Sequence, residues 1–327
     1  MAQNKLNYGN QLIQKTWSKL LRCPICGHRL SSGLAKFYCL NQKCRTSFPI
    51  IARVPIMLNE GNSITSIKEI VRQRKAVNKP VLGKIVNNSL KRTLPSLSSN
   101  ITSDKNYRLL AKLITRKSRK PRILVLGGRI LGKGMKPLLN KSIELIESDV
   151  RFGPRTALIC DAHDIPFKDN SFDGVVIQAV LEHVVDPVRC VSEIHRVLKA
   201  DGLVYAETPF MQQVHGGRYD FNRYSMLGHR RLFRRFQEVA SGPVGGPGSA
   251  LAWSLKYFLL SFTTVRSVRI IIKFASQWLF FGFKYFDHFL FHNPASLDAA
   301  FGYYFMGKKS NKLVTDRAIL KLYRGGE

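Results

Sequence analysis

The sequence predicts an α/β protein whose central parallel sheet follows a small metal-binding module. Four cysteines near the start have the spacing of a metal ribbon. After Pro121, short apolar strands alternate with helix-like segments, which favours a parallel sheet with helices on both faces. The chain has 327 residues, of which 45% are hydrophobic, and this is enough for two or three folding units.

Four cysteines define the expected module, residues 1–59: Cys23, Cys26, Cys39 and Cys44. The runs C-P-I-C and C-L-N-Q-K-C can each form a tight knuckle, so that four thiolates meet one Zn²⁺ ion tetrahedrally. Such a closed site has no open coordination position, so we expect the zinc to be structural. The β-rich run 48–58 is expected to be the edge strand that closes the ribbon. The alternative is four unconnected thiols.

The two remaining cysteines, Cys160 and Cys190, lie in apolar surroundings and are expected to be buried small side chains rather than a disulfide. The first residues lack the apolar core of a secretory signal. Both observations predict a reducing compartment, the cytoplasm.

The formal net charge is +31, from 52 Lys and Arg against 21 Asp and Glu. Such an excess favours a polyanionic partner: nucleic acid, an acidic membrane surface or a phosphate-bearing substrate. The alternative is a solvated basic surface without a dedicated partner.

Residues 60–105 are expected to be a basic polar linker or cap, with a helix over 64–77. The elements of the following α/β domain, residues 106–242, come in order: strand 122–126, a glycine-rich turn, a helix that includes 135–139, strands 143–146, 157–159 and 174–177, helix 187–198 and strand 203–207.

The glycine-rich turn contains the candidate cofactor glycines: Gly127, Gly128, Gly132 and Gly134. Glycines after the first strand let the backbone approach a ligand closely, and a helix N-terminus there offers N–H donors. Glu147 and Asp149 end the next strand, where a carboxylate can accept both hydroxyls of a ribose. The alternative for this loop is a packing turn.

The most specific stretch reads C-D-A-H-D-I-P-F-K-D-N-S-F-D-G-V over 160–175, followed by L-E-H-V-V-D-P and E-I-H-R-V-L-K-A-D-G. These motifs resemble the class I S-adenosylmethionine-dependent methyltransferases of the small-molecule type, whose sequences run D-A-x-x-L-P-F-x-D-x-S-F-D-x-V and then L-E-H-V-x-D-P. The resemblance covers about Arg122 to Thr208. It implies a Rossmann-like methyltransferase sheet and S-adenosylmethionine as cofactor.

Carried over residue by residue, the resemblance makes Gly127 the first loop glycine and Asp149 the ribose-binding acid. Asp161 would bind the adenine amino group, with Ala162 beside it, and Gln178 would face the methionine part of the cofactor.

The chain departs from the family pattern in its glycine loop. Val125 stands where the family usually has an acid, and Arg129 stands at the second glycine. The remaining glycines would restore the turn in a shifted register. An inactive methyltransferase-like adaptor therefore stays open as an alternative.

Methyl transfer needs alignment and removal of a proton from the acceptor, so few catalytic residues are required. His215 and Asp220 are candidate bases, because their polar stretch follows a strand at the edge where open α/β sheets bind ligands. His183 matches the family in L-E-H-V and is the third candidate; the alternative is that it has a packing role.

Residues 243–327 are expected to form an aromatic, basic helical tail. Lys and Arg interrupt every apolar run before it reaches the length of a membrane span. Arg266, Arg269, Lys273 and Gln277 recur at helical spacing opposite aromatic residues, which suits a helix lying in an anionic membrane interface. The alternative is that this face packs on the core or on a second subunit.

Two further resemblances bear on the substrate. The ribbon, with F-P-I and V-P-I-M-L after it, resembles the zinc-ribbon activator of tRNA and release-factor methyltransferases. The run E-T-P-F-M-Q-Q-V-H and the aromatic tail resemble bacterial methyltransferases of surface-polysaccharide synthesis. The predicted function is methylation of a sugar or lipid-linked glycan intermediate, peripherally at the inner membrane face. An rRNA or tRNA methyltransferase is the alternative enzyme.

Overall fold

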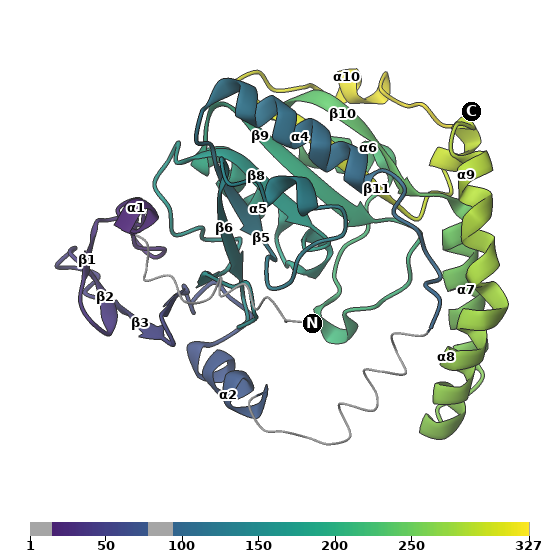
Figure 1. The fold of residues 1–327 in the computed structure, drawn as a ribbon, viewed down its shortest axis with the longest axis horizontal. Helices are drawn as coiled ribbons and strands as arrows, with labels where there is room; N and C mark the ends of the chain where they lie inside the picture. The colour runs from purple at the N-terminus through teal and green to yellow at the C-terminus, as the bar shows by residue number, and fades with distance from the viewer. Residues whose placement is uncertain (1–14, 78–93, 327) are drawn as a thin grey trace, which may run out of the picture.

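The computed structural model describes residues 15–77 and 94–326 (Figure 1). Its strands are β1 (Leu30–Ser32), β2 (Lys36–Cys39), β3 (Ser47–Ile51), β4 (Val54–Met57), β5 (Arg122–Leu126), β6 (Glu144–Asp149), β7 (Leu158–Cys160), β8 (Phe172–Gln178), β9 (Leu198–Pro209), β10 (Phe236–Gly245) and β11 (Gly302–Lys309). Its α-helices are α1 (Lys15–Ser18), α2 (Ile67–Val77), α4 (Ser103–Lys117), α5 (Pro187–Val197), α6 (Met226–Leu232), α7 (Pro247–Ser261), α8 (Arg266–Phe280), α9 (Phe286–Leu290) and α10 (Asp316–Leu320). Short 3₁₀ turns are η2 (Lys136–Leu138), η3 (Leu181–His183), η4 (Gly217–Tyr219), η5 (Phe281–Tyr285) and η6 (Pro294–Leu297).

The strands form one sheet in the order β1-β2-β3-β4-β7-β6-β5-β8-β9-β11-β10. Strands β4, β7, β6, β5, β8 and β9 run parallel to their neighbours in this series, whereas β11 is antiparallel to both β9 and β10. The predicted parallel α/β sheet is therefore confirmed.

Both faces of the central sheet are buried, as the near-continuous apolar strands require. On β5, Ile123 and Val125 pack into the cluster that contains the inner face of α4, whereas Leu124 and Leu126 pack into the cluster on the side of α5. The two-residue period of the strand thus places successive side chains under helices on opposite faces.

The cysteine-bearing module is joined to the central sheet by its last strand. The expected edge strand 48–58 is two strands: β3 pairs antiparallel with β4, and Ala52 and Arg53 between them have positive φ. Strand β4 then pairs in parallel with β7, with Ile56 opposite Ile159 and Met57 opposite Cys160. The ribbon therefore extends the sheet, and Figure 1 shows it at the end of the molecule opposite α7 and α8.

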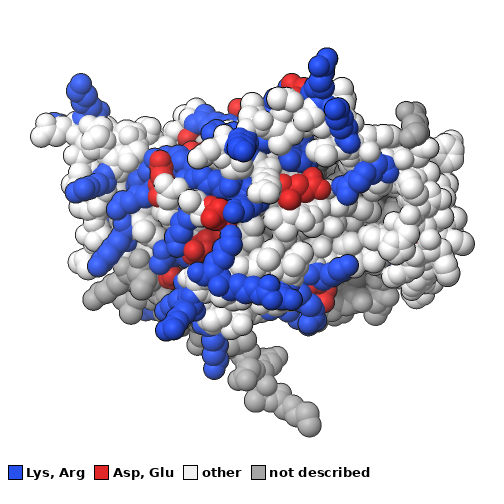
Figure 2. Space-filling model, turned by 90° about the horizontal axis from the view of Figure 1, so that it is seen from above, with Lys and Arg blue, Asp and Glu red and all other residues white. Residues whose placement is uncertain are grey.

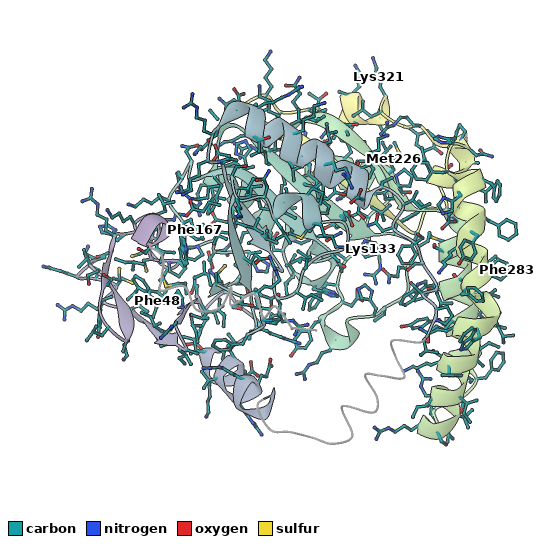
Figure 3. All side chains as sticks on the ribbon, viewed as in Figure 1. Phe48, Lys133, Phe167, Met226, Phe283 and Lys321 are labelled. Carbon is teal, nitrogen blue, oxygen red and sulfur yellow. The ribbon has the colours of Figure 1, made fainter. Side chains whose placement is uncertain are left out.

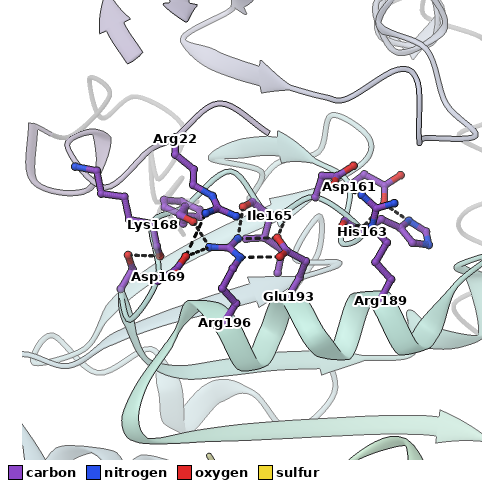
Figure 4. Close-up of polar contacts among 12 residues, drawn as sticks. Arg22, Asp161, His163, Ile165, Lys168, Asp169, Arg189, Glu193 and Arg196 are labelled. Carbon is purple, nitrogen blue, oxygen red and sulfur yellow. Dashed lines mark hydrogen bonds and ion pairs between the residues drawn. The ribbon is translucent and has the colours of Figure 1, made fainter. Parts of the chain in front are cut away.

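A second set of contacts fastens the start of the module to the loop after β7 (Figure 4). Leu21 forms an isolated antiparallel bridge with Phe167, and Arg22 pairs with Asp169 at 3.2 Å. Arg196 on α5 supports this loop by donating to the carbonyls of Phe167 at 2.7 Å and Ile165 at 2.8 Å. The ring of Phe167, labelled in Figure 3, lies 6.0 Å from that of Trp17. Sheet pairing and loop contacts together fix the module on the sheet.

The structure differs from the sequence expectation after the glycine loop. The helix expected to include 135–139 is only the 3₁₀ turn η2, because Gly132, Gly134 and Pro137 interrupt it and β6 begins at Glu144. The expected linker helix is present as α2, while the linker segment 78–93 lies outside the described residues.

The C-terminal region is not helical throughout. Helices α7, α8 and α9 stand together at one end of the molecule, but β11 returns into the central sheet between β9 and β10 (Figure 1). Asp287 is fully buried and anchors the N-terminus of α7, because its carboxylate accepts from the amides of Gly248 at 2.7 Å and Ser249 at 3.2 Å. Among the described residues, no helix has the length and hydrophobicity needed to cross a bilayer.

Candidate functional site

A cavity of about 620 Å³ opens at the carboxyl ends of the parallel strands β5, β6, β7 and β8. Open α/β sheets bind ligands at this edge. Its lining includes most of the predicted cofactor residues: Gly127, Gly132, Asp149, Asp161, Ala162 and Gln178. The structure brings these residues together, and their individual roles remain predictions.

The glycine loop needs its glycines for space. Gly127 has φ +79°, and a Cβ there would overlap the side chain of Val180. A Cβ on Gly132 would likewise overlap the Gln178 amide. Gly128 and Gly134 do not line the cavity; they pack closely against Glu147 and Ser103. The loop therefore places two glycines, Gly127 and Gly132, along the cavity wall, although the helix expected after the loop is not formed.

Of the two candidate ribose-binding acids on β6, Asp149 lines the cavity and Glu147 does not. Glu147 is buried and paired with Arg155 at 2.7 Å. The Asp149 carboxylate accepts from the amides of Arg151 at 2.9 Å and Arg129 at 3.3 Å, and burial raises its pKa. Of the two candidates, Asp149 is the one at the cavity, and its binding to a ribose stays a prediction.

Asp161 is held between the α/β domain and the segment after the ribbon. Its carboxylate accepts from the Ser63 hydroxyl at 2.6 Å and from the His163 ring at 2.5 Å (Figure 4). Burial opposes ionisation, but these hydrogen bonds outweigh it and hold the pKa of Asp161 below its usual range. Ile64 and Thr65 continue from Ser63 into the cavity wall. The N-terminal region therefore completes the cavity wall beside Asp161.

A functional residue that sequence reasoning missed is Glu207, at the carboxyl end of β9. It lines the cavity and accepts from Tyr205 at 2.5 Å and from Gln178 and Asn100 at 2.8 Å each. Burial raises its pKa. The Oε1 atom of Gln178 is buried and has no hydrogen-bond partner in the described part of the chain. Glu207 and this oxygen offer acceptors for the α-ammonium group of S-adenosylmethionine.

Glu207 could have been noticed in E-T-P-F, because an acid at the carboxyl end of a parallel strand points to the ligand edge of the sheet. It supplies a carboxylate at the cavity although Val125 replaces the acid usual in the glycine-loop motif. Lys133, which Figure 3 shows near the middle of the molecule, also lines the cavity, and burial lowers its pKa. The residues present therefore fit both charged groups of the cofactor's methionine end.

The three predicted catalytic residues lie together beside the cavity. His183 lines it, and His215 lies with its ring centroid 5.1 Å from that of His183. Asp220 accepts from the amides of His215 at 2.8 Å and Gly216 at 3.0 Å and pairs with Arg223. Burial opposes ionisation of Asp220, but hydrogen bonds led by that from Arg223 hold its pKa well below the ordinary value. This makes it a weak base. The Glu182 carboxylate, 3.7 Å from Nε2 of His215, raises the pKa of His215.

The four ribbon cysteines also converge. Their sulfur atoms all lie within 4.8 Å of one another, with Cys26 and Cys39 3.4 Å apart and Cys23 and Cys44 3.9 Å apart. Sulfur ligands of one tetrahedral zinc ion lie about 3.8 Å apart, so the arrangement fits the predicted ion. The Thr46 hydroxyl lowers the pKa of Cys44 to about 7, which favours a thiolate there. Cys160 and Cys190 are buried and free, as expected.

Comparison with known proteins agrees with this geometry. Residues 139–206 match the family described as methyltransferase domain. The match therefore places sequence similar to a methyltransferase domain in the central part of the chain. The match supports the predicted enzyme class, and the strand order agrees with the predicted fold.

Two curated relatives illustrate the extent of the similarity. A ubiquinone/menaquinone biosynthesis C-methyltransferase of Geotalea uraniireducens is 42% identical over 66 residues, 18% of this chain and 27% of that protein. A demethylmenaquinone methyltransferase of Staphylococcus epidermidis is 50% identical over 44 residues, 14% and 18% of the two chains. The chain thus matches less than a third of the length of either relative.

Among solved structures, phosphoethanolamine N-methyltransferase 2 of Haemonchus contortus with bound S-adenosylmethionine superposes with a TM-score of 0.41 and 14% identity. The superposition covers 64% of this chain and 53% of that one.

Proposed function

We propose that this methyltransferase transfers a methyl group from S-adenosylmethionine to a sugar or lipid-linked glycan intermediate at an anionic membrane surface. The cofactor half of the proposal is supported by the cavity and its polar lining. The names of the curated relatives concern quinone biosynthesis, but those matches span only 66 and 44 residues. They therefore support the reaction class and say nothing of the acceptor here.

The observation that carries the membrane half is the apolar surface of α7, α8 and α9. Large side chains that are at least one-third exposed gather there: Leu251, Phe258, Phe262, Val268, Ile270, Ile271, Phe274, Trp278, Leu279, Phe286, Phe289 and Leu290. Side chains extend outward at this end around Phe283 in Figure 3, and the same end is largely without charge in Figure 2. Exposed apolar surface of this extent marks an interaction site.

Charge beside this surface favours an anionic membrane as the partner. On α8, the exposed Arg266 and Lys273 flank the face formed by Ile270, Phe274 and Trp278. An interfacial helix combines such a basic stripe with aromatic and aliphatic side chains that enter the acyl boundary. Arg269 is used differently, since it donates to the carbonyls of Leu260 at 2.6 Å and Thr263 at 2.8 Å and so joins α7 to α8.

Helix α7 contacts the loop that reaches the cavity wall through Gly216 and Tyr219. Tyr257 on α7 donates to the carbonyl of Val214 at 2.7 Å, and Ser254 accepts from Gln213 at 2.9 Å. The polar loop that carries His215 is therefore tied to the helix whose other side is apolar. A lipid-linked acceptor held at α7 and α8 would present its polar head to this loop.

Co-sedimentation with phosphatidylglycerol-containing vesicles tests the membrane half. We expect the wild type to sediment and the variant Phe274→Ser/Trp278→Ser to stay largely in solution. Leu34→Ser is the control, because Leu34 is even more exposed than Phe274 and Trp278 but lies in the ribbon. Equal sedimentation of the wild type and the double variant would contradict the proposal. Transfer of radiolabelled methyl groups from S-adenosylmethionine into a bacterial glycolipid extract tests the acceptor.

RNA is the second candidate acceptor, favoured by the net charge of +31 and by the Lys and Arg spread over much of the face in Figure 2. A salt-sensitive shift of rRNA or tRNA, with labelling of the RNA and none of the glycolipid, would establish it instead. Failure of the folded, metal-loaded protein to bind S-adenosylmethionine would leave the inactive adaptor.

A further inference from the structure

We propose that Glu182, His183 and His215 form a second metal site, which binds a divalent transition-metal ion of the zinc class beside the cofactor cavity. One ligand atom from each residue can be chosen so that all three lie within 4.8 Å of one another. This site is separate from the four-cysteine cluster in the ribbon.

The donor atoms are arranged around the Glu182 carboxylate. Its Oε1 atom lies 3.7 Å from Nε2 of His215 and 3.9 Å from Nε2 of His183. Ligands of one tetrahedral zinc ion, with bonds of about 2.0–2.1 Å, lie about 3.4 Å apart. Each distance from Glu182 to a histidine therefore needs to shorten by only a few tenths of an ångström. The ligand atoms of the two histidines lie within 4.8 Å of one another, and His215 sits in a loop with an exposed edge that can bring them closer.

The second ring nitrogens are occupied as they are in metal-bound histidines. His183 donates from Nδ1 to the carbonyl of Tyr219 at 2.7 Å. Nδ1 of His215 faces the carbonyl of Gln213 at 3.4 Å and Oδ2 of Asp220 at 3.6 Å. Such partners fix the tautomer that leaves Nε2 free for a metal, and they orient the ring. Both histidines thus present the same nitrogen to Glu182.

Glu182 supplies an independent sign that something is bound there. The residue is 1% exposed, and its Oε2 atom is buried without a hydrogen-bond partner in the described part of the chain. A buried carboxylate is costly unless it is paired with a cation or binds a metal. Its backbone carbonyl accepts from the amides of Phe221 at 2.7 Å and Asn222 at 3.2 Å, which holds the 215–222 loop against η3.

Two histidines and one carboxylate leave a coordination position open, which is the arrangement of catalytic rather than structural zinc. The position would face the cavity, because His183 lines it together with Gly216 and Tyr219. Resting on the proposed function, an acceptor hydroxyl bound there would lose its proton to solvent more easily. Its oxygen would then bond the methyl carbon as the bond from that carbon to the sulfonium sulfur breaks, releasing S-adenosylhomocysteine.

Cobalt(II) titration of the zinc-loaded full-length protein tests the site, with calorimetry for stoichiometry and visible absorption for ligand type. We expect one cobalt ion to bind beyond the cysteine-bound zinc, with the bands of a nitrogen and oxygen site and without thiolate charge transfer. His215→Ala and Glu182→Gln should each weaken this binding by more than about tenfold. His292→Ala, an exposed histidine on the C-terminal region, should leave it unchanged.

S-adenosylhomocysteine binding and thermal melting of each variant show whether it is folded. A folded wild type that binds S-adenosylhomocysteine but takes up no second metal ion would overturn the metal site and leave the proposed function standing. Undiminished cobalt binding in folded His215→Ala and in folded Glu182→Gln would also overturn it. Absence of S-adenosylhomocysteine binding with normal cobalt uptake would instead count against the proposed function alone.

Discussion

Asp149 and Glu147 stand two residues apart on β6, so the alternation of a strand points both side chains to the same face, and their positions along the strand give them different surroundings. Asp149 reaches the cavity, while Glu147 is buried against Arg155. The sequence offered both acids for the ribose. Asp149 is the last residue of β6 and Glu147 lies inside the strand, and a motif does not show how far along the strand the cavity begins.

We expect Asp149→Ala to weaken S-adenosylhomocysteine binding by about thirtyfold, because charge-assisted hydrogen bonds worth about 2 kcal/mol are lost. Isothermal titration calorimetry measures this. Glu147→Gln should change the affinity much less, since its carboxylate does not line the cavity. The opposite order of the two variants would assign the ribose to Glu147.

His229 on α6 is buried, and its Nε2 atom has no hydrogen-bond partner within the described residues. Burial lowers its pKa to about 3, so it stays neutral in the folded protein while the unfolded chain binds a proton below about pH 6.5. The unfolded state therefore binds more protons between these values, and stability falls as the pH falls through this window.

His229→Phe should remove this dependence. Phe fits the aromatic surroundings, where the His229 ring lies 5.2 Å from Phe233 edge to face. Between pH 7 and pH 5, we expect the free energy of unfolding to fall by about 2 kcal/mol less in the variant than in the wild type. Urea unfolding at the two pH values measures the difference. Parallel pH profiles for both proteins would mean that His229 titrates normally in the folded state.

At the scale of elements, the regular α/β segments were predictable and the irregular joins were not. Apolar runs predicted the five strands β5, β6, β7, β8 and β9 close to where they lie. The Asp-Pro pair likewise predicted the start of helix α5. The turn between β3 and β4 was missed because Ala52 and Arg53 take positive φ without a glycine to signal it. The prediction of a helix after the glycine loop was wrong. It rested on the spacing of apolar residues and gave no weight to Gly134 and Pro137, which disfavour a helix.

The C-terminal helices show a tertiary anchor that no local pattern predicts. Asp287 reaches α7 from a distant segment and caps it, in place of a residue preceding the helix. Asp287→Ala would leave the amides of Gly248 and Ser249 and the Ser249 hydroxyl buried without this acceptor.

We expect Asp287→Ala to lower the free energy of unfolding by about 2 kcal/mol, with Asp287→Asn less harmful because an amide oxygen still accepts. Chemical denaturation followed by circular dichroism measures both. Asp298→Ala on the exposed surface of the same region is the control. An Asp287→Ala variant as stable as this control would show that the cap contributes little.

For the whole molecule, the structure links the ribbon to the cofactor cavity. Asn59 and Asn62 donate to Asp164 at 3.0 and 3.2 Å, and Ser63 donates to Asp161. These residues directly follow β4, so their positions depend on a folded ribbon. A four-cysteine module of this size depends on its metal for folding.

The double variant Cys26→Ser/Cys44→Ser should therefore bind S-adenosylhomocysteine about tenfold more weakly, even though no cysteine of the cluster lines the cavity. Calorimetry on the variant and the zinc-loaded wild type measures the change. Ser63→Ala should reproduce part of this loss of affinity while the metal stays bound to the ribbon. Unchanged affinity in the double variant would show that the ribbon and the cavity are independent.

The pairing of β4 with β7 also has a consequence for the order of events during synthesis. Ile56 cannot pair with Ile159 until the ribosome has synthesised about a hundred more residues. The cysteine module can close around its metal as soon as it emerges from the ribosome, while β4 still presents an unsatisfied edge. We expect this early-formed edge to act as a template that selects the register of β7 when it arrives, so that a metal bound at the start of the chain helps to set the position of a strand in its middle.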